Sequence, residues 1–415
     1  MTSVSARPPS QLGKASHRME SMSTGEQATV EQTALVPTTV EQTTVEESSD
    51  SPAAAKPGVR EPQYRRTVSY ARSGVSIHAR PEAVEVLRDT AQRSWRPEVV
   101  EDAGGFAGLF RLGLAKYRKP LLASSTDGVG PKLSIAQQMD MHDTIGVDLV
   151  AMVVDDIVAC GAEPLFMLYY LSCGEVVPDR VAAVTAGIGD GCRAAGCAML
   201  GGETAEHPGV LRAHEYDLSG SGIGVVDEDR RLGAARVEVG DVIVAMGSSG
   251  LHANGYGLVQ HALLGLSRMR LDTVVEEFDN QRTLGQELLA PTRIYARDCL
   301  DLLVEAEVRA FAHITGGGIA GNLERVLPEG ADALVRRSSW RPQPVFDLVA
   351  RKGRIEQSEM EATFNMGIGM AAVVAPEDAE RAVAFLRGRG VDAWLAGEIV
   401  EGAGTVQLVG SHTRG

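Results

Sequence analysis

The chain has 415 residues, a hydrophobic fraction of 44% and a formal net charge of −15 at pH 7. This length allows two domains and a tail, and the acidic balance argues against a nucleic-acid binder, which would present a basic surface. No apolar run is long enough to span a bilayer, and the five cysteines show no C-x-x-C spacing. We therefore predict free thiols, no membrane or nucleic-acid partner, and a cytoplasmic location.

Residues 1–60 are rich in Ser, Thr, Glu, Pro and Gln, and Val-Glu-Gln-Thr occurs at both 30–33 and 40–43. Such a composition cannot bury enough apolar surface to order itself, so it predicts a disordered low-complexity tail. Folded sequence is predicted from about Tyr64, with a first helix over Pro81–Arg93.

The first motif that indicates chemistry follows a predicted strand. Pro120–Ala123 is a short apolar run typical of a buried strand. Thr126-Asp127-Gly128-Val129-Gly130 comes next, and Lys132 adds a cation. A carboxylate at a strand end, glycines that let the backbone approach a ligand, and an ammonium suit a magnesium–phosphate ligand. The alternative is an ordinary strand-to-loop turn.

An apolar stretch with two adjacent acids predicts a buried helix. Asp148–Ala162 is long enough for a helix and contains Asp155 and Asp156. A carboxylate buried without a partner is costly. Either one of these acids faces solvent while the other caps or pairs locally, or a metal ion is the partner.

Downstream segments alternate between strand and helix patterns, which predicts an α/β or α+β fold. The predicted strands are Leu165–Leu171, Cys197–Leu200, Tyr216–Val226, Asp241–Met246, Phe311–Ile314, a segment within Thr363–Val374, Trp394–Val400 and Val406–Val409. The predicted helices are Pro178–Ala195, Leu258–Leu264, Leu288–Ala306 interrupted by Pro291, Ile319–Val326 and Asp378–Arg387. The charged stretch Asp227–Gly240 indicates a boundary between domains at 61–230 and 231–415.

Two further glycine-rich segments follow predicted strands. Gly201-Gly202-Glu203-Thr204 puts a carboxylate at a second strand tip, and Thr315-Gly316-Gly317-Gly318 leads into a predicted helix. Backbone N–H groups at such a strand-to-helix turn favour an anion. A flexible connector is the alternative for the second segment.

The order of these motifs resembles the phosphoribosylformylglycinamidine cyclo-ligases, the aminoimidazole ribonucleotide synthetases of purine biosynthesis. The resemblance extends from about Tyr70 to the C-terminal region. The matching stretches include Arg96–Val99, Thr126–Gly130 with Lys132, His142–Met152, Gly161–Phe166, Gly201–Glu206, Gly247–Gly250 with His252, Leu289–Tyr295, Thr315–Gly318 and Thr363–Asn365.

This resemblance implies a two-domain PurM-like fold and an ATP-dependent ring closure. The N-terminal sheet domain would bind ATP and form the interface of a homodimer, and the C-terminal domain would be α/β. ATP would activate the formamide oxygen of formylglycinamidine ribonucleotide, a small nucleotide substrate. The amidine nitrogen would then attack, phosphate would leave, and the imidazole ring would close.

The resemblance also implies roles for individual residues. The Mg²⁺ ligands would be Asp127, Asp156 and Glu203. The ATP-binding residues would be Thr126, Asp127, Gly128, Val129, Gly130, Lys132 and Asp156. The substrate-binding residues would be Asn254, Thr315, Gly316, Gly317, Gly318 and Tyr169, with the glycine turn on the 5′-phosphate. The catalytic residues would be His252, Asp127 and Lys132.

Within that set, Lys132 would neutralise phosphate charge, and His252 would act as a general acid or base or stabilise the activated oxygen. A structural loop histidine is the alternative for His252.

Several positions depart from the family's usual pattern. Pro131 replaces a threonine, Ser73-Gly74-Val75-Ser76 lacks an acid, and Tyr169 stands where many members carry an aspartate. Tyr169 would either face the reacting end of the substrate or point into the core. These departures keep two alternatives open: a diverged paralogue that activates another amide-like oxygen, and a non-catalytic scaffold relative.

Overall fold

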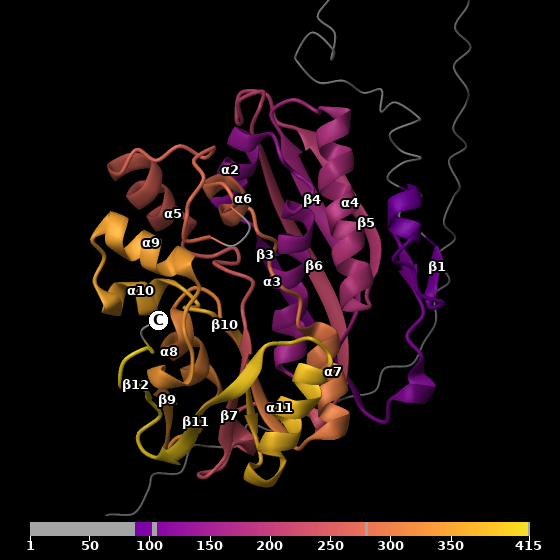
Figure 1. The fold of residues 1–415 in the computed structure, drawn as a ribbon. Coiled ribbons are helices and arrows are strands. Elements are labelled where there is room, and N and C mark those ends of the chain that lie inside the picture. The colour runs from indigo at the N-terminus through magenta and orange to yellow at the C-terminus, as the bar shows by residue number, and fades with distance from the viewer. Residues whose placement is uncertain (1–87, 102–105, 279–280, 414–415) are drawn as a thin grey trace, which may run out of the picture. The chain divides into compact units, whose positions relative to one another are not determined.

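The computed structural model describes residues 88–101, 106–278 and 281–413, which belong to one compact unit spanning Arg66–Gly415. The tail predicted at 1–60, the Ser73–Ser76 motif and residues 81–87 of the first predicted helix lie outside the described residues. Residues 88–92 of that helix are helical. Two larger β-sheets, each with helices packed against it, form the predicted α/β architecture (Figure 1).

The first of these sheets has four strands in the order β3-β6-β4-β5. Its strands are β3 (Pro120–Gly128), β6 (Tyr216–Asp227), β4 (Glu163–Cys173) and β5 (Ala198–Glu206). β6 pairs antiparallel with β3 and β4, whereas β4 and β5 are parallel. The helix α4 (Pro178–Ala195) connects β4 to β5, because parallel neighbours need a crossover connection. A separate ribbon consists of β1 (Val99–Glu101) and β2 (Leu109–Phe110).

The helix α3 (Ile145–Ala159) contacts both sheets, through β3 and β6 on one side and β8 on the other. Most of its side chains are buried, which accounts for its nearly continuous apolar sequence. It also packs closely on α4: a Cβ atom at Gly146 would lie 2.2 Å from the backbone nitrogen of Ile188. Because only glycine allows this approach, a side chain at Gly146 would force the two helices apart.

The other face of the first sheet is open. Leu122 on β3 is 67% exposed, and Leu168 and Tyr170 on β4 are 41% and 40% exposed. On β4 the exposed side chains alternate with buried ones, as expected for a strand with one covered face. The sheet therefore presents apolar side chains on the side away from α3 and α4.

The second of these sheets has six strands in the order β12-β9-β11-β7-β10-β8. Its strands are β7 (Val242–Gly247), β8 (Val308–His313), β9 (Ala331–Arg336), β10 (Ile368–Val374), β11 (Ala393–Glu401) and β12 (Val406–Val409). The accompanying helices are α5 (Tyr256–Val259) with a π-helix at Gln260–Leu266, α6 (Leu284–Leu288), α7 (Ala296–Glu305), α8 (Gly318–Leu323), α9 (Pro344–Gly353), α10 (Gln357–Thr363) and α11 (Ala379–Gly388). The chain passes from one sheet to the other between Asp227 and Val242, the stretch that suggested a domain boundary.

Some elements differ from the sequence prediction. Leu288–Ala306 is not one helix, because α6 ends at Leu288 and α7 begins only at Ala296, beyond Pro291, which cannot continue a helix. Gly201–Thr204 lies inside β5 rather than at its tip, since β4 pairs with it along that whole stretch. β9, α9 and α10 are not predicted from the sequence, because their apolar runs are short.

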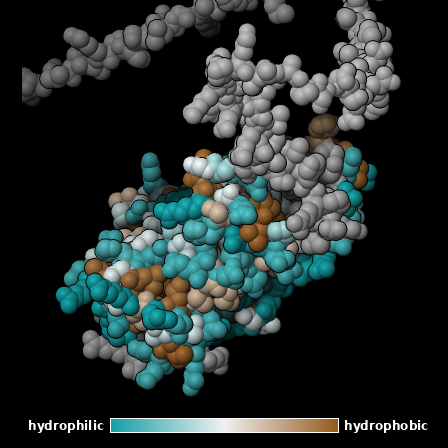
Figure 2. All heavy atoms as spheres, turned by 90° about the horizontal axis from the view of Figure 1, so that it is seen from above, coloured by the Kyte–Doolittle hydropathy of each residue, from teal (hydrophilic) through white to brown (hydrophobic). Residues whose placement is uncertain are grey.

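Among the described residues, no helix combines the length and apolar character needed to cross a membrane. Figure 2 shows the face seen from above, where apolar side chains form small groups within a mostly hydrophilic surface.

Candidate active site

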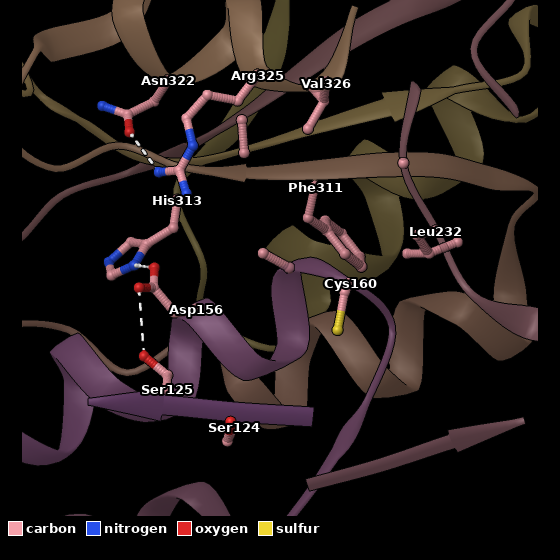
Figure 3. Close-up of a pocket in the computed structure, with 13 residues that line it drawn as sticks. Ser124, Ser125, Asp156, Cys160, Leu232, Phe311, His313, Asn322, Arg325 and Val326 are labelled. Atoms are coloured by element: carbon pink, nitrogen blue, oxygen red, sulfur yellow. Dashed lines mark hydrogen bonds and ion pairs between the residues drawn. The ribbon is translucent and has the colours of Figure 1, made fainter. Parts of the chain in front are cut away.

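A cavity of about 330 Å³ opens between the two sheets. Its walls come from β3 and α3 on one side and from β8, α8 and the turn after α8 on the other (Figure 3). The lining residues used below are Ser124, Ser125, Asp156, Cys160, Leu232, Phe311, His313, Asn322, Arg325 and Val326. One part of the wall is apolar, and the other carries charged and hydrogen-bonding groups.

Asp156 and His313 form a pair across this cavity. His313 Nδ1 donates to Asp156 Oδ1 at 2.9 Å, and Ser125 Oγ donates to Asp156 Oδ2 at 3.4 Å. Burial alone would raise the pKa of Asp156, but the hydrogen bond and charge of His313 hold that pKa below its ordinary value. Asp156 is therefore an ionised carboxylate whose side chain is still 37% exposed.

Asp127 lies close to this pair. It is near the end of β3, and the backbone N–H of Gly128 donates to its Oδ1 at 2.7 Å. Its pKa is raised, chiefly by burial and additionally by the negative charge of Asp156, while the bond from Gly128 opposes the rise. The two neighbouring carboxylates repel each other, and a cation bound between them would offset this repulsion.

Glu203 does not join these two carboxylates. Side chains of directly paired residues share a face of the sheet, and Glu203 pairs with Tyr170, which points to the open face. Asp127 belongs to the covered face, on the side of α3. The described residues contain no cluster of three or more His, Cys, Asp or Glu side chains that could hold a metal. Of the three predicted ligands, the structure therefore brings together Asp127 and Asp156 and leaves Glu203 on the other face of the sheet.

The rest of the Thr126–Gly130 motif has mixed surroundings. Thr126 also points to the open face, where its hydroxyl shares a hydrogen bond of 2.8 Å with Ser221. Val129 is buried at 1% exposure. Gly130 has a φ of +69° and open space where a Cβ would stand, so its backbone is accessible at this turn.

Lys132 is buried in a polar junction between the two halves. It begins α2 (Lys132–Met139), and its ammonium has no exposed surface. Its Nζ donates to Asp148 Oδ1 at 2.8 Å, His252 O at 3.0 Å and Ala290 O at 2.7 Å. All three ammonium hydrogens therefore have partners, and the predicted contact of Lys132 with phosphate does not fit this conformation.

His252 is also buried, with 3% of its surface exposed and a φ of +62°. Its Nε2 accepts from the backbone N–H of Ser249 at 3.2 Å. Burial, with the positive charges of His313, Lys132 and Arg293, lowers the pKa of His252 well below its ordinary value. The imidazole is therefore neutral near pH 7 and is held inside its loop, as in the structural alternative.

The two adjacent acids of α3 have different environments. Asp155 is fully buried, and the backbone N–H of Tyr295 donates to its Oδ1 at 3.0 Å and its Oδ2 at 3.2 Å. Burial raises the pKa of Asp155 to about 7. Asp155 thus anchors the segment before α7, and Asp156 is the acid that faces the cavity.

The glycine turn lies at the same end of the cavity as Asn322. Gly317 and Gly318 have φ values of +94° and +64°, and a Cβ at Gly318 would lie 1.8 Å from the carbonyl oxygen of Glu361. Asn322 Nδ2 donates to Gly318 O at 2.8 Å and Gly316 O at 3.2 Å, which fixes the turn. Asn254 is adjacent, since its Nδ2 lies 4.0 Å from the Cβ position of Gly316.

Tyr169 lies on the covered face and is 7% exposed. Its ring packs over Gly202, where a Cβ would come within 2.1 Å of the ring. Burial raises the pKa of its phenol to about 12. This geometry corresponds to the interpretation in which Tyr169 points into the core.

Among the cavity residues that sequence reasoning missed, His313, Asn322 and Arg325 carry the groups best suited to bind a ligand. His313 precedes the glycine turn by two positions, and the other two follow it on α8 and directly after it. Their closeness in sequence to the glycine turn could have predicted them, because side chains at both ends of a strand-to-helix turn meet at the same edge of a sheet.

Comparisons with known proteins agree with this arrangement. The N-terminal domain of AIR synthase related protein matches residues 107–226, and its C-terminal domain matches residues 238–409. The phosphoribosylformylglycinamidine cyclo-ligase of Anaeromyxobacter sp. (strain K) is 49% identical over 336 residues, which are 81% of this chain and 96% of the relative. The enzyme of the same name from Geobacillus thermodenitrificans (strain NG80-2) is 46% identical, with the same coverage.

Two solved structures show the fold alone, at 19% identity. Thiamine-monophosphate kinase from Stenotrophomonas maltophilia K279a has a TM-score of 0.59 and covers 80% of this chain and 97% of its own. The hydrogenase maturation protein HypE, in complex with ATP, has a TM-score of 0.56 and covers 81% of this chain and 93% of its own. The curated relatives and both family models together show that the chain belongs to the phosphoribosylformylglycinamidine cyclo-ligase family.

Proposed function

We propose that this protein is an ATP-dependent cyclo-ligase that converts formylglycinamidine ribonucleotide to aminoimidazole ribonucleotide in purine biosynthesis. The observation that carries the proposal is the 49% identity to a named cyclo-ligase across 81% of the chain. Asp127, Asp156 and the Thr315–Gly318 turn support it, because they supply carboxylates and an anion-compatible turn next to a cavity.

The reaction breaks a carbon–oxygen bond and forms a carbon–nitrogen bond. ATP transfers its γ-phosphoryl group to the formamide oxygen, and the amidine nitrogen then attacks the formamide carbon. The oxygen leaves as part of phosphate, a far better leaving group than the bare oxygen, and ADP is the other product. Catalysis of phosphoryl transfer depends mainly on positioning and on neutralising charge.

Asp127 and Asp156 fit a magnesium ion. Mg²⁺ commonly uses one or two carboxylates together with substrate phosphates and water. The repulsion that contributes to the raised pKa of Asp127 comes from Asp156, so these two groups favour a shared cation. When bound, Mg²⁺ would neutralise charge on the ATP phosphates. The bonds from His313 and Ser125 orient the Asp156 carboxylate for this purpose.

Lys132 and His252 support the site instead of contacting ligands. Lys132 ties α2 to the carbonyl of His252 and to that of Ala290, so it fixes the loop after β7 against the N-terminal half. Ser249 in the same loop donates from its hydroxyl to Pro291 O at 2.7 Å. These contacts hold the loop that carries Asn254 beside the glycine turn.

The proposed assembly is a homodimer formed through the open face of the first sheet. Leu122, Leu168 and Tyr170 are exposed there, and an apolar sheet face gains stability when a second copy covers it. We further propose a cytoplasmic location, which the five free cysteines support.

Complementation tests the proposed function in cells. The gene should restore growth without added purine to a strain that lacks its own cyclo-ligase, and the Asp127→Ala variant should not. An Asp190→Ala variant, changed at an exposed position on α4, is the matched control and should restore growth. Failure of the wild-type gene, expressed as folded protein, would favour a diverged paralogue with another substrate.

A further inference from the structure

Three side chains that have no assigned contact with the substrate meet at the polar end of the cavity: His313, Asn322 and Arg325 (Figure 3). Arg325 Nη1 donates to Asn322 Oδ1 at 3.4 Å, which tethers the guanidinium to the residue that fixes the glycine turn. Arg325 is exposed, and its charge helps to lower the pKa of Asp156 across the cavity, but across the described ranges it forms no salt bridge within 4.0 Å. Most of its N–H donors therefore remain available to a ligand.

His313 provides a second, independent sign of a ligand. Its side chain is 2% exposed, yet its buried Nε2 has no hydrogen-bond partner in the part of the chain that the structure describes. The other ring nitrogen, Nδ1, is taken up by Asp156, so Nε2 is the ring nitrogen that remains for a ligand. A buried ring nitrogen without a partner is costly unless a group such as a hydroxyl, which can both donate and accept, reaches it.

The remaining walls limit what fits between these groups. Ser124 and Ser125 line the cavity on the β3 side, and Phe311, Leu232 and Val326 form an apolar wall. A volume of about 330 Å³ suits a compact molecule. A matching ligand has an anionic group that binds Arg325, a hydroxyl that binds His313 and a small carbon skeleton between the two. A sugar phosphate has these three features.

We propose that this end of the cavity is a ribose 5-phosphate subsite. Arg325 binds the phosphate group, and His313 Nε2 forms a hydrogen bond with a ribose hydroxyl. This assignment rests on the proposed function, which supplies a ribonucleotide substrate. It places the main phosphate contact on a cationic side chain beside the Thr315–Gly318 turn, where a bidentate guanidinium contact is stronger than neutral backbone donors.

Calorimetric titration of the full chain with ribose 5-phosphate tests both contacts. Arg325→Met should weaken binding of ribose 5-phosphate and of inorganic phosphate by about tenfold or more, and Arg325→Lys by less. His313→Leu should weaken ribose 5-phosphate alone and leave inorganic phosphate unchanged. Arg351→Met is the matched control, because Arg351 is half-exposed on α9 and pairs with Glu277; it should bind like the wild type. Melting temperatures of all variants check that they fold.

Cys160 reports where the ligand binds. Cys160 lines the same cavity and is partly exposed. The other four cysteines are buried: Cys173, Cys192, Cys197 and Cys299. Burial raises the pKa of its thiol, so alkylation by N-ethylmaleimide is best followed by mass spectrometry at mildly alkaline pH. Ribose 5-phosphate should slow modification of Cys160 in the wild type and not in Arg325→Met, and ribose should not slow it.

Distinct outcomes would overturn the proposal. Equal binding of ribose 5-phosphate by wild type and Arg325→Met would remove Arg325 from the subsite. If Mg·ATP slows modification of Cys160 and ribose 5-phosphate does not, this end of the cavity binds the triphosphate of ATP. Neither measurement requires turnover, so the two proposals fail separately. If the protein closes the ring but Arg325→Met and His313→Leu bind ribose 5-phosphate like the wild type, only the subsite is refuted. If these variants bind more weakly as expected but the wild type does not close the ring, only the proposed function is refuted.

Discussion

Asp127 and Asp156 are the carboxylates on which the proposed use of magnesium depends. Asp127→Asn should abolish ATP-dependent turnover at every Mg²⁺ concentration, because a charged oxygen ligand is replaced by a neutral amide of nearly the same shape. Stability should change little or rise, since the substitution removes repulsion from Asp156 and a carboxylate that burial already disfavours. Turnover titrated against Mg²⁺, together with thermal unfolding, measures both effects. Near-wild-type turnover would mean that the Thr126–Gly130 motif is a structural turn.

Glu203→Gln provides the matched comparison for that measurement. Glu203 shares the open face with Tyr170, on the other side of the sheet from Asp127. The Mg²⁺ concentration that gives half-maximal turnover should therefore stay as in the wild type. Loss of turnover in Glu203→Gln, or a clearly higher requirement for Mg²⁺, would support the predicted set of three ligands.

Tyr169 shows how a sequence comparison and a structure differ at one position. An aspartate there, common in the family, predicts a functional carboxylate, and on that reading Tyr169→Asp would improve ring closure. The buried ring over Gly202 indicates instead that Tyr169→Asp should destabilise the fold by about 3 kcal/mol or more, through lost packing and an unpaired buried charge. Tyr169→Phe should stay within about 1 kcal/mol of the wild type. Chemical denaturation compares them, and a stable Tyr169→Asp variant with faster turnover would favour the substrate-facing interpretation.

At the scale of single elements, α3 organises the site through acids on different faces. Asp148 and Asp155 are fully buried and accept from the backbone N–H groups of Thr292 and Tyr295, so they dock the segment between α6 and α7. Asp156 turns toward the cavity instead. One helix thus fixes the C-terminal half and supplies a proposed metal ligand.

Asp155 gives this helix a defined pH dependence. Its pKa of about 7 in the folded protein, raised by burial, exceeds the value of about 3.9 expected for an unfolded chain. The folded state therefore holds a proton that the unfolded state releases. This contribution to stability is full below about pH 4 and is lost as the pH rises through about 7. Asp155→Asn, which stays neutral, should gain in melting temperature relative to the wild type between pH 5 and pH 8.

Thermal unfolding of both proteins across that range measures the effect. The difference in melting temperature, not either value alone, isolates Asp155 from the other titrating groups. A difference that stays constant from pH 5 to pH 8 would contradict the raised pKa.

The elements with strong periodic signals were predictable. Pro178–Ala195 was predicted as a helix with the bounds observed, because Pro178, Gly196 and the apolar spacing mark its ends. Val406–Val409 was predicted as a strand with the bounds observed. The helix predicted across Pro291 was wrong at that proline. Periodicity does not register the missing N–H of a proline or the contacts of Thr292 and Tyr295 with Asp148 and Asp155, which hold the segment between α6 and α7.

The candidate site was predictable only in part, for a related reason. A motif indicates that Asp127 and Lys132 are near each other in sequence, but it does not say which faces a cavity. Lys132 is buried by contacts with His252 and Ala290, which are distant in the chain. Glu203 was separated from Asp127 by the register of β5, which no local pattern encodes.

At the scale of the whole molecule, the open face of the first sheet predicts self-association. Leu168→Arg should convert the proposed dimer to a monomer, because it puts a charge into an apolar interface and, at 41% exposure, disturbs little within one subunit. Val304→Arg is the control, since Val304 is 85% exposed on α7, outside that face. Sedimentation velocity at micromolar concentration distinguishes the two states. A wild-type protein that sediments as a monomer would contradict the proposed assembly.

The most direct test of the account is the stoichiometry of the purified protein with formylglycinamidine ribonucleotide, ATP and Mg²⁺. The proposed reaction predicts equal amounts of ADP, phosphate and aminoimidazole ribonucleotide, with no ADP formed when the ribonucleotide is left out. ADP released without an imidazole product, or no turnover by folded protein at saturating ATP and Mg²⁺, would contradict the assignment as a cyclo-ligase.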